Sequence, residues 1–207
     1  QALTRKAAWS QAIELLDAVR IPNAKGRVSD YPFQMSGGQR QRAMIAMALA
    51  CRPKILIADE PTTALDVTVQ AQIFDLLSDL RQQTGTAIIL ITHDMGAVAE
   101  MAERMIVMYA GRKAELGPVD QIIDRPRHPY TKGLIECVPH IQDDPSSERH
   151  NLVEVPGIVP SLREFGKDQC LFASRCPYVT ETCLKSRPVA KQFKNDQSAD
   201  CWHAEAL

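Results

Sequence analysis

The stretch Ile55-Leu56-Ile57-Ala58-Asp59-Glu60 decides the fold of this 207-residue chain. Its apolar residues run without interruption, which is typical of a strand that is buried on both faces of a parallel sheet. Two carboxylates follow where the strand ends, and parallel sheets bind ligands at the carboxyl ends of their strands. The stretch therefore predicts an α/β fold with a site at Asp59 and Glu60.

A second apolar strand, Ala87 to Ile91, is followed by Thr92-His93-Asp94. Between the two strands, apolar residues at helical spacing predict a crossover helix over 67–82, so the strands are expected to be parallel. His93 then lies at the same sheet edge as Asp59. An imidazole there can donate a hydrogen bond to developing phosphoryl charge, although a lone histidine is more often structural.

Upstream, Ser36-Gly37-Gly38-Gln39 opens a predicted helix over 37–51, with Ser36 as its N-cap. Glycines in the first turn leave backbone N–H groups uncovered, and such a helix start binds anions. The plain alternative is a capped helix whose glycines only make a tight turn. Asp66, in the loop before the crossover helix, either caps that helix or reaches a partner subunit.

The two carboxylates suit nucleotide hydrolysis. Asp59 can hold Mg²⁺, directly or through water, while Glu60 orients and deprotonates the attacking water. Alternatively, Asp59 caps the following segment and Glu60 is only solvated. The sequence contains no G-x-x-x-x-G-K-[ST] loop to wrap the phosphates of the nucleotide.

Four motifs occur in order, M-S-G-G-Q, I-L-I-A-D-E-P-T, T-A-L-D and L-I-T-H-D, and together they resemble the nucleotide-binding subunit of an ATP-binding cassette (ABC) transporter. The resemblance implies part of a P-loop NTPase-like ABC ATPase core. It also implies ATP and Mg²⁺ as ligands, Glu60 as catalytic base and His93 as switch. Ser36, Gly37, Gly38 and Gln39 would contact ATP held by the opposing subunit, and Asp66 would act across the dimer.

The P-loop and the glutamine loop of that family lie upstream of these motifs, and Met35 stands where the family usually has leucine. We therefore expect the chain to be the carboxyl-terminal portion of a longer subunit. Alone, it is expected neither to bind nor to hydrolyse ATP appreciably.

The tail resembles that of ATPase subunits of dipeptide and oligopeptide importers, through Arg127-His128-Pro129-Tyr130-Thr131 and Pro156-Gly157-Ile158-Val159-Pro160. This implies peptide uptake by a peripheral subunit on the cytoplasmic face of the bacterial inner membrane. Its partners would be a second ATPase subunit in a heterodimer, transmembrane permeases and, indirectly, a periplasmic peptide-binding protein. From the residues alone, His128 and Tyr130 indicate only a helix-start turn with an anchored aromatic ring.

Two rival functions stay open: a soluble cassette ATPase of DNA repair or translation, and a non-catalytic scaffold fragment. The formal net charge of −1, from 24 basic and 25 acidic residues, argues against a dominant nucleic-acid role. No apolar run approaches the roughly 20 residues that cross a bilayer.

Four cysteines, Cys170, Cys176, Cys183 and Cys201, lie close together in the tail, with His203 nearby. Their spacing excludes neither an iron–sulfur cluster, nor zinc, nor free thiols. The resemblance to peptide importers implies a 4Fe-4S cluster on these four residues. Such a cluster would staple a small domain that is poor in apolar residues.

The predicted organisation has three parts. Residues 1–52 belong to a helical subdomain with the Ser36 motif, residues 53–125 to the ATPase core with its parallel sheet, and residues 126–207 to a small Cys-rich C-terminal metal-binding domain.

Overall fold

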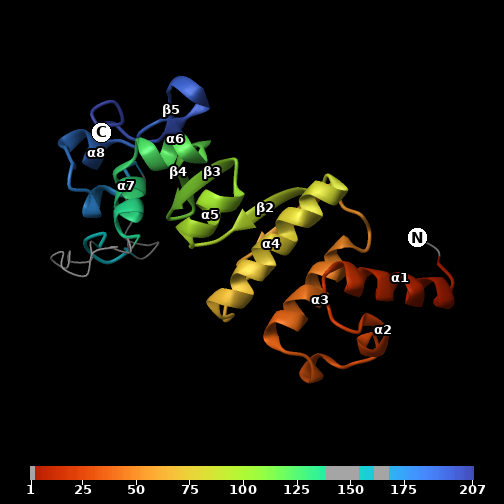
Figure 1. The fold of residues 1–207 in the computed structure, drawn as a ribbon. Helices are drawn as coiled ribbons and strands as arrows, with labels where there is room; N and C mark the ends of the chain where they lie inside the picture. Colours follow the sequence, from red (N-terminus) through yellow and green to blue (C-terminus); the bar gives the residue numbers. More distant parts are fainter. Residues whose placement is uncertain (1–2, 139–153, 161–167) are drawn as a thin grey trace, which may run out of the picture. The chain divides into compact units, whose positions relative to one another are not determined.

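The computed structural model describes residues 3–138, 154–160 and 168–207. The chain divides into two compact units, residues 1–97 and 98–207, and helix α5 (Met95–Met101) spans the boundary between them. Figure 1 labels most of the helices and strands of both units. Each unit is described by itself.

Helices α1 (Arg5–Ala18), α2 (Ala24–Arg27) and α3 (Gly37–Leu49) open the first unit, with a short 3-10 turn at Pro32–Gln34. Helices α1 and α3 pack together, and the buried Arg42 of α3 contributes to this packing. Its guanidinium donates to the carbonyl of Val19, 3.1 Å away, and to Gln72 Oε1, 3.0 Å away. One buried cation thus links the end of α1 to α3 and α4.

A β-α-β unit completes residues 1–97. Strand β1 (Ile55–Asp59) leads into helix α4 (Val67–Thr84) and then into β2 (Ala87–Ile91). The strands are parallel, with Ile55 opposite Ala87 and Asp59 opposite Ile91. Helix α4 buries the stripe that the sequence predicts and ends at Gly85, whose positive φ of 67° favours glycine. The predicted α/β fold with a parallel sheet is confirmed.

The expectation that β1 is buried on both faces is wrong for the described chain. Burial alternates along β1, and Ile55 and Ile57 are exposed to 58% and 64%. Ile89 and Ile91 of β2 are also exposed. The physical reason is that β1 and β2 form a two-stranded sheet within the described residues, so the side of each strand that carries these isoleucines has no apolar cover there.

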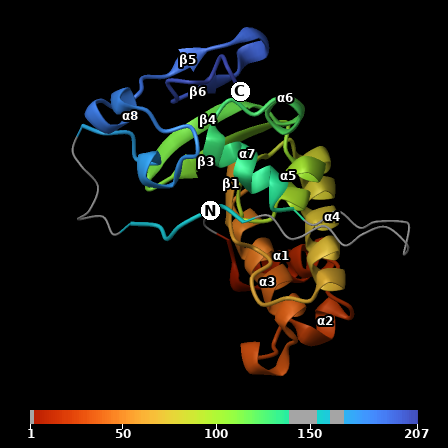
Figure 2. The ribbon, with the colours of Figure 1, turned by 90° about the vertical axis from the view of Figure 1, so that its left-hand side faces the viewer.

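The second unit contains an antiparallel sheet of order β3-β4-β6-β5 (Figure 2). Strands β3 (Arg104–Tyr109) and β4 (Arg112–Pro118) form a hairpin that turns at Gly111. Strands β5 (Lys191–Gln192) and β6 (Ser198–Ala199) have two residues each, and they flank the 3-10 turn Lys194–Asp196. Residues 98–207 therefore bring the end of the chain into the same sheet as β3 and β4.

In the described part of residues 98–207, the sheet is accompanied by the short helices α6 (Val119–Asp124), α7 (Pro129–Glu136) and α8 (Glu181–Lys185), with a 3-10 turn at Ala173–Arg175. An aromatic cluster lies among them. The ring of Tyr109 meets those of Tyr130 and Phe172 edge-on, at centroid distances of 4.8 and 5.2 Å. Such pairs stabilise a small core beyond their buried area. They anchor α7 and the segment at 172 to strand β3.

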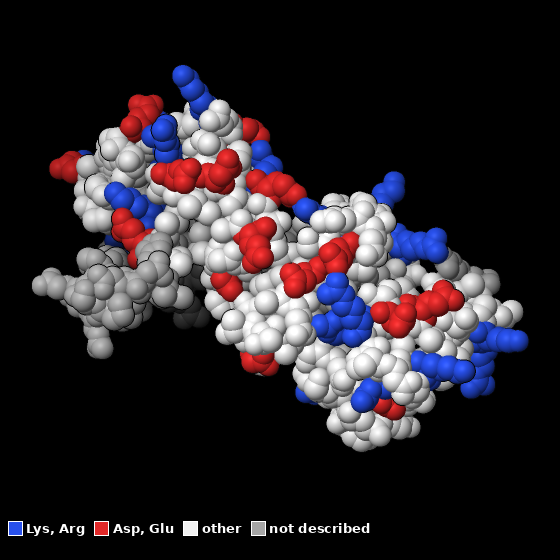
Figure 3. Space-filling model, viewed as in Figure 1, with Lys and Arg blue, Asp and Glu red and all other residues white. Residues whose placement is uncertain are grey.

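Basic and acidic side chains are interspersed on the face shown in Figure 3, which agrees with the near-neutral net charge. Across the described ranges, the structure contains no helix that is both long enough and apolar enough to span a membrane.

Candidate functional site

Strands β1 and β2 bring the predicted acidic and imidazole groups to one rim of the sheet. Asp59 is the last residue of β1 and lies opposite Ile91. The next amide, that of Glu60, still donates to the Ile91 carbonyl at 2.8 Å. Glu60 itself has a positive φ of 43°, which is uncommon for a residue with a side chain. The backbone therefore turns sharply where the Glu60 side chain leaves the sheet.

Glu60 and His93 contact each other across this rim. The distance from His93 Nδ1 to Glu60 Oε1 is 3.2 Å, and Thr63 Oγ1 donates to Glu60 Oε2 at 2.9 Å. The hydrogen bond from Thr63, followed by the contacts with His93, lowers the pKa of Glu60. The carboxylate is therefore ionised at neutral pH while both side chains remain open to solvent, since His93 is 84% exposed. Sequence reasoning missed Thr63 as a partner of this carboxylate.

The Ser36 motif forms a complete capping box at the start of α3. Ser36 Oγ accepts from the Gln39 amide at 3.3 Å, and Gln39 Oε1 accepts from the Ser36 amide at 3.1 Å. The amides of Gly37 and Gly38 precede the first intrahelical donors and have no hydrogen-bond partner within the part of the chain that the structure describes. These two N–H groups are the ones that an anion would meet at this helix start.

The two glycines also pack closely against the start of α4. A Cβ on Gly38 would lie 2.7 Å from Val69 Cγ1, and one on Gly37 would lie 3.3 Å from Leu65 Cδ2. Asp66, between these two neighbours, caps α4 by accepting from the Val69 amide at 2.9 Å. The capping alternative for Asp66 is therefore confirmed, and the two helix starts lie against each other.

Asp94 joins the loop after β2 to helix α4, a role that sequence reasoning missed. Its Oδ1 accepts from the amides of Gly96 and Ala97, and Gln70 donates to its Oδ2 at 2.6 Å. The sequence signal was available, because an aspartate just before a helix is a common cap. Asp94 thereby fixes the loop that carries His93.

The Ser36 motif and the acidic rim make different contacts in this chain. Among the described residues, no hydrogen bond or ion pair joins Ser36 or Gln39 to Glu60 or His93. The helix start instead contacts residues 65 and 69. The structure thus brings Asp59, Glu60 and His93 to one sheet edge and packs the Ser36 motif on the start of α4.

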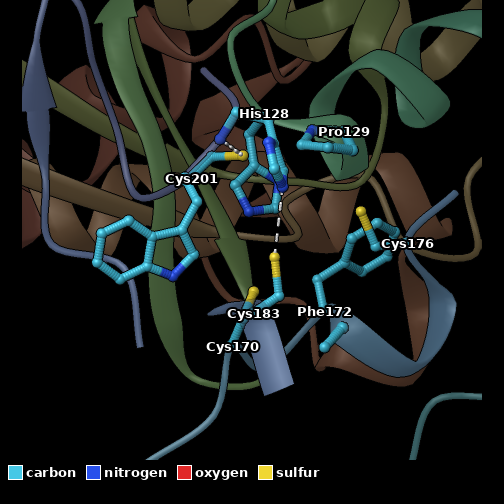
Figure 4. A pocket seen from close by; sticks show the side chains of 10 residues that line it. His128, Pro129, Cys170, Phe172, Cys176, Cys183 and Cys201 are labelled. Carbon is cyan, nitrogen blue, oxygen red and sulfur yellow. Dashed lines mark hydrogen bonds between the residues drawn. The ribbon is translucent and has the colours of Figure 1, made fainter. Parts of the chain in front are cut away.

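A second candidate site lies within residues 98–207, where all four predicted cysteines line one narrow cavity with His128, Phe172 and His203 (Figure 4). The cysteines are unpaired. Burial raises the pKa of Cys170, of Cys176 and, to about 11, of Cys201, so these thiols stay protonated in the absence of a cation. The described residues contain no group of three or more His, Cys, Asp or Glu side chains placed to hold a metal ion.

His203 contacts two of the residues around this cavity. Its Nε2 lies 3.6 Å from Cys183 Sγ and 3.3 Å from Thr180 Oγ1. Its amide donates to Cys201 Sγ at 3.3 Å. His203 thus contacts two of the four thiols, those of Cys183 and Cys201.

His128, at the start of α7, is buried and borders the same cavity. Its Nδ1 accepts from the Tyr130 amide at 3.1 Å, which confirms the predicted helix-start turn, and Tyr130 anchors the turn in the aromatic cluster. Burial lowers the pKa of His128 to about 4, so the ring is neutral near pH 7.

The backbone at His128 is held by Glu115, a fully buried carboxylate on β4 that sequence reasoning missed. Glu115 accepts from the amides of Arg127 and His128, at 2.8 and 3.1 Å, and from Gln197 Nε2 at 2.8 Å. Burial raises the pKa of Glu115, and the donated hydrogen bonds oppose that rise. This network ties β4, the turn before α7 and the residue before β6 into one unit.

Two family models match the chain. The model of the ABC transporter family matches residues 2–63, and the model of the oligopeptide/dipeptide transporter C-terminal region matches residues 114–183. The first match covers the Ser36 motif, Asp59 and Glu60. The second covers Glu115, His128 and three of the four cysteines.

Curated relatives carry matching names. The chain is 50% identical over 205 residues to "Probable peptide ABC transporter ATP-binding protein y4tR" of Sinorhizobium fredii, covering 99% of this chain and 60% of the relative. It is 49% identical over 198 residues to "Oligopeptide transport ATP-binding protein OppD" of Haemophilus influenzae, covering 96% and 59%. The chain therefore spans about three fifths of the length of these relatives.

Solved structures agree at the level of the ATPase fold. One is a dimeric ATP-binding cassette in a post-hydrolysis state bound to ADP and Pi, with a TM-score of 0.50, 32% identity, and coverage of 57% of this chain and 50% of that one. Another is an inward-facing ABC transporter of metal-chelate type, with a TM-score of 0.53, 29% identity, and coverage of 58% and 47%. The predicted resemblance is confirmed: over nearly its whole length this chain is similar to ATP-binding proteins of peptide and oligopeptide ABC transporters.

Proposed function

We propose that this chain is the carboxyl-terminal portion of an ATP-hydrolysing subunit that energises peptide import. The observation that carries the proposal is the shared rim of β1 and β2, where Glu60 Oε1 lies 3.2 Å from His93 Nδ1 and Asp59 ends the adjoining strand. The names of the relatives and the match to the C-terminal region of peptide transporters support peptides as the transported substrate.

In this proposal Glu60 is the general base. Its ionised carboxylate accepts a proton from a water molecule as the water oxygen attacks the γ-phosphorus of ATP and the bond to the ADP oxygen breaks. Thr63 holds one carboxylate oxygen, so the other is directed toward His93. His93 can then donate to the phosphoryl group and sense its departure.

Asp59 is the residue that would hold Mg²⁺, because a carboxylate at the carboxyl end of a strand is the donor that this hard cation prefers. The cation would neutralise charge on the phosphates. The position of Asp59 beside Glu60 supports this role, because both carboxylates lie at the same end of β1.

The Ser36 motif serves a nucleotide on the opposing subunit. Support comes from the uncovered amides of Gly37 and Gly38, and from the packing of this helix start on residues 65 and 69 instead of on Glu60. Asp66 holds the start of α4 against it. A composite site therefore needs a second ATPase subunit, and we propose a heterodimer docked on permeases at the cytoplasmic face of the bacterial inner membrane.

For the tail, we propose that residues 126–207 form a Cys-rich domain in which Cys170, Cys176, Cys183 and Cys201 hold a 4Fe-4S cluster. The support is that the four thiols border one cavity and that four thiolates are the donor set of such clusters, whereas the described side chains form no group of three or more placed to hold a metal ion. When bound, the cluster would supply cross-links among segments that have little apolar core of their own.

The experiment that tests the ATPase proposal compares this chain with a version extended upstream to the length of its relatives. We expect steady ATP turnover from the extended protein, with loss of turnover and retained ATP binding in its Glu60→Gln variant. We expect no turnover from this chain alone. Equal turnover in the Glu60→Gln variant, or capture of ribosomes or DNA in place of a permease, would overturn the proposal.

A further inference from the structure

The position of His93 depends on the loop that carries it. Its side chain is 84% exposed, and its Nδ1 lies 3.2 Å from Glu60 Oε1. An exposed side chain changes rotamer freely, because neighbouring atoms do not confine it. The contacts of residues 92–94 therefore decide whether the imidazole meets the Glu60 carboxylate.

Hydrogen bonds on both sides of His93 give this loop its shape. The Asp94 amide donates to Thr92 Oγ1 at 3.1 Å, which closes a turn around His93. Asp94 Oδ1 accepts from the amides of Gly96 and Ala97, at 2.9 and 3.2 Å, at the start of α5. All of these contacts lie within residues 92–97, so they shape the loop without attaching it to β1 or α4.

Two contacts attach the loop, one on each side of His93. Before His93, the Ile91 carbonyl at the end of β2 accepts from the Glu60 amide at 2.8 Å. After His93, Asp94 Oδ2 accepts from Gln70 Nε2 of α4 at 2.6 Å. An ionised carboxylate only accepts hydrogen bonds, so the Gln70 amide must turn its N–H toward Asp94, and a bond to a charged acceptor is stronger than a neutral one.

Gln70 is itself well placed to hold the loop. It lies in the first turn of α4, where its backbone amide donates to the Asp66 carbonyl at 2.9 Å. Asp66 caps the same turn through the Val69 amide. The donor that reaches Asp94 therefore stands on a fixed helix start.

We infer that Gln70 is a positioning residue for His93: by holding Asp94, it keeps the imidazole where it meets the Glu60 carboxylate and a nucleotide phosphate. The inference rests on the ATPase function proposed above. Without this bond His93 spends less time in the productive geometry, and a displacement of about 1 Å can lower a rate by up to about 100-fold. Because His93 acts on charge that develops in the transition state, the loss should fall on kcat and leave KM for ATP nearly unchanged.

Four variants isolate this hydrogen bond. Gln70→Met keeps the length of the side chain and removes the donor, and Gln70→Glu keeps its shape but places a second carboxylate against Asp94. Gln70→Lys is the rescue variant, because it keeps an N–H donor. Gln72→Met is the matched control, since Gln72 lies on the same helix and accepts from Arg42 at 3.0 Å instead of contacting the His93 loop.

The test uses the upstream-extended protein, with ATP turnover and the nuclear magnetic resonance signal of the His93 side chain as readouts. Glu60→Gln should shift the His93 signal in an otherwise wild-type protein, because the two side chains are in contact. Gln70→Met and Gln70→Glu should reduce this Glu60-dependent shift and lower kcat about tenfold, with KM for ATP within about twofold. Gln70→Lys should restore most of both, and Gln72→Met should leave both unchanged.

A wild-type kcat or an undiminished Glu60-dependent shift, in either Gln70→Met or Gln70→Glu as long as that variant folds, would overturn the inference. Equal losses in Gln72→Met or in Gln70→Lys would also overturn it, and each of these results leaves the ATPase proposal intact. Absence of turnover in the wild type would instead overturn the ATPase proposal. The His93 signal needs no turnover, so it would still decide whether Gln70 holds His93 against Glu60.

Discussion

The contact between Gly38 and Val69 gives the sharpest stability prediction. A methyl group at position 38 would lie 2.7 Å from Val69 Cγ1, closer than packed carbon atoms come. Overpacking of this kind costs about 1–3 kcal/mol. Replacing glycine by alanine in a compatible backbone gains about 0.5 kcal/mol by itself. We therefore expect Gly38→Ala to lower the free energy of unfolding by about 0.5–2.5 kcal/mol.

Removing the methyl groups of Val69 should reverse the sign of the stability change that Gly38→Ala causes. In a Val69→Ala background the next closest atom to the new methyl group is the Cβ of residue 69, at 3.9 Å, which is an ordinary contact. There, Gly38→Ala should stabilise the chain by about 0.5 kcal/mol. The double-mutant cycle then gives a coupling energy of about 1–3 kcal/mol.

Urea unfolding followed by circular dichroism measures all four proteins of the cycle. Gly37→Ala is the matched control, because its methyl group would lie 3.3 Å from the flexible end of Leu65. We expect it to change stability by no more than about 0.5 kcal/mol and not to couple to Val69→Ala. A Gly38→Ala penalty that persists unchanged in the Val69→Ala background would refute the packing explanation.

Three further predictions concern single contacts. Asp66→Ala should cost about 1 kcal/mol by uncapping α4, and Asp66→Asn should restore most of it in thermal unfolding; equal losses would show that the charge matters instead. Arg42→Met should cost about 1–3 kcal/mol, because the Val19 carbonyl and Gln72 lose their donor, and wild-type stability in urea would contradict this. Burial raises the pKa of Glu115, so its contribution to stability is full below about pH 4.5 and declines as the pH rises through the folded-state pKa. The stability difference between wild type and Glu115→Gln should therefore be larger at pH 4.5 than at pH 7.5, and growth of this difference with pH would show that the donated hydrogen bonds dominate.

Much of the first unit could be predicted because its signals are local. Ser36 and Asp66 mark helix starts by chemistry that acts within a turn, and the structure places a cap at each. The position of helix α4 between two apolar strands in the sequence predicts that the strands pair in parallel, as β1 and β2 do.

The contacts of Glu60 could not be predicted in the same way. Its carboxylate meets Thr63 and His93 because the backbone turns at Glu60 with φ of 43°, and no periodic pattern reports a single turn of this kind. The exposed faces of β1 and β2 were missed for a related reason. An apolar side chain indicates what a strand can bury, and what covers it depends on other segments.

In the second unit, β5 and β6 are too short for any periodicity, so their addition to β4 was beyond sequence reasoning. The Glu115 network joins residues far apart in the chain. Glutamate, arginine and glutamine usually lie on the surface, so none of these residues by itself indicates a buried network. The four cysteines were found because their residue type is rare, yet only the structure shows that they border one cavity with His128.

The central claim is that the Ser36 helix start and the Glu60–His93 rim of one chain serve different nucleotides. The test measures how many ATP molecules one ATPase dimer hydrolyses in a single turnover. In that dimer, the upstream-extended chain carries Ser36→Asp, Glu60→Gln or both changes. Ser36→Asp keeps the cap but repels phosphate, and Ser36→Asn is its neutral control. If the two groups serve different sites, each single change removes one site of the assembled transporter, and the double change removes both. If the double change loses no more than either single change, both groups serve one nucleotide and the claim is wrong.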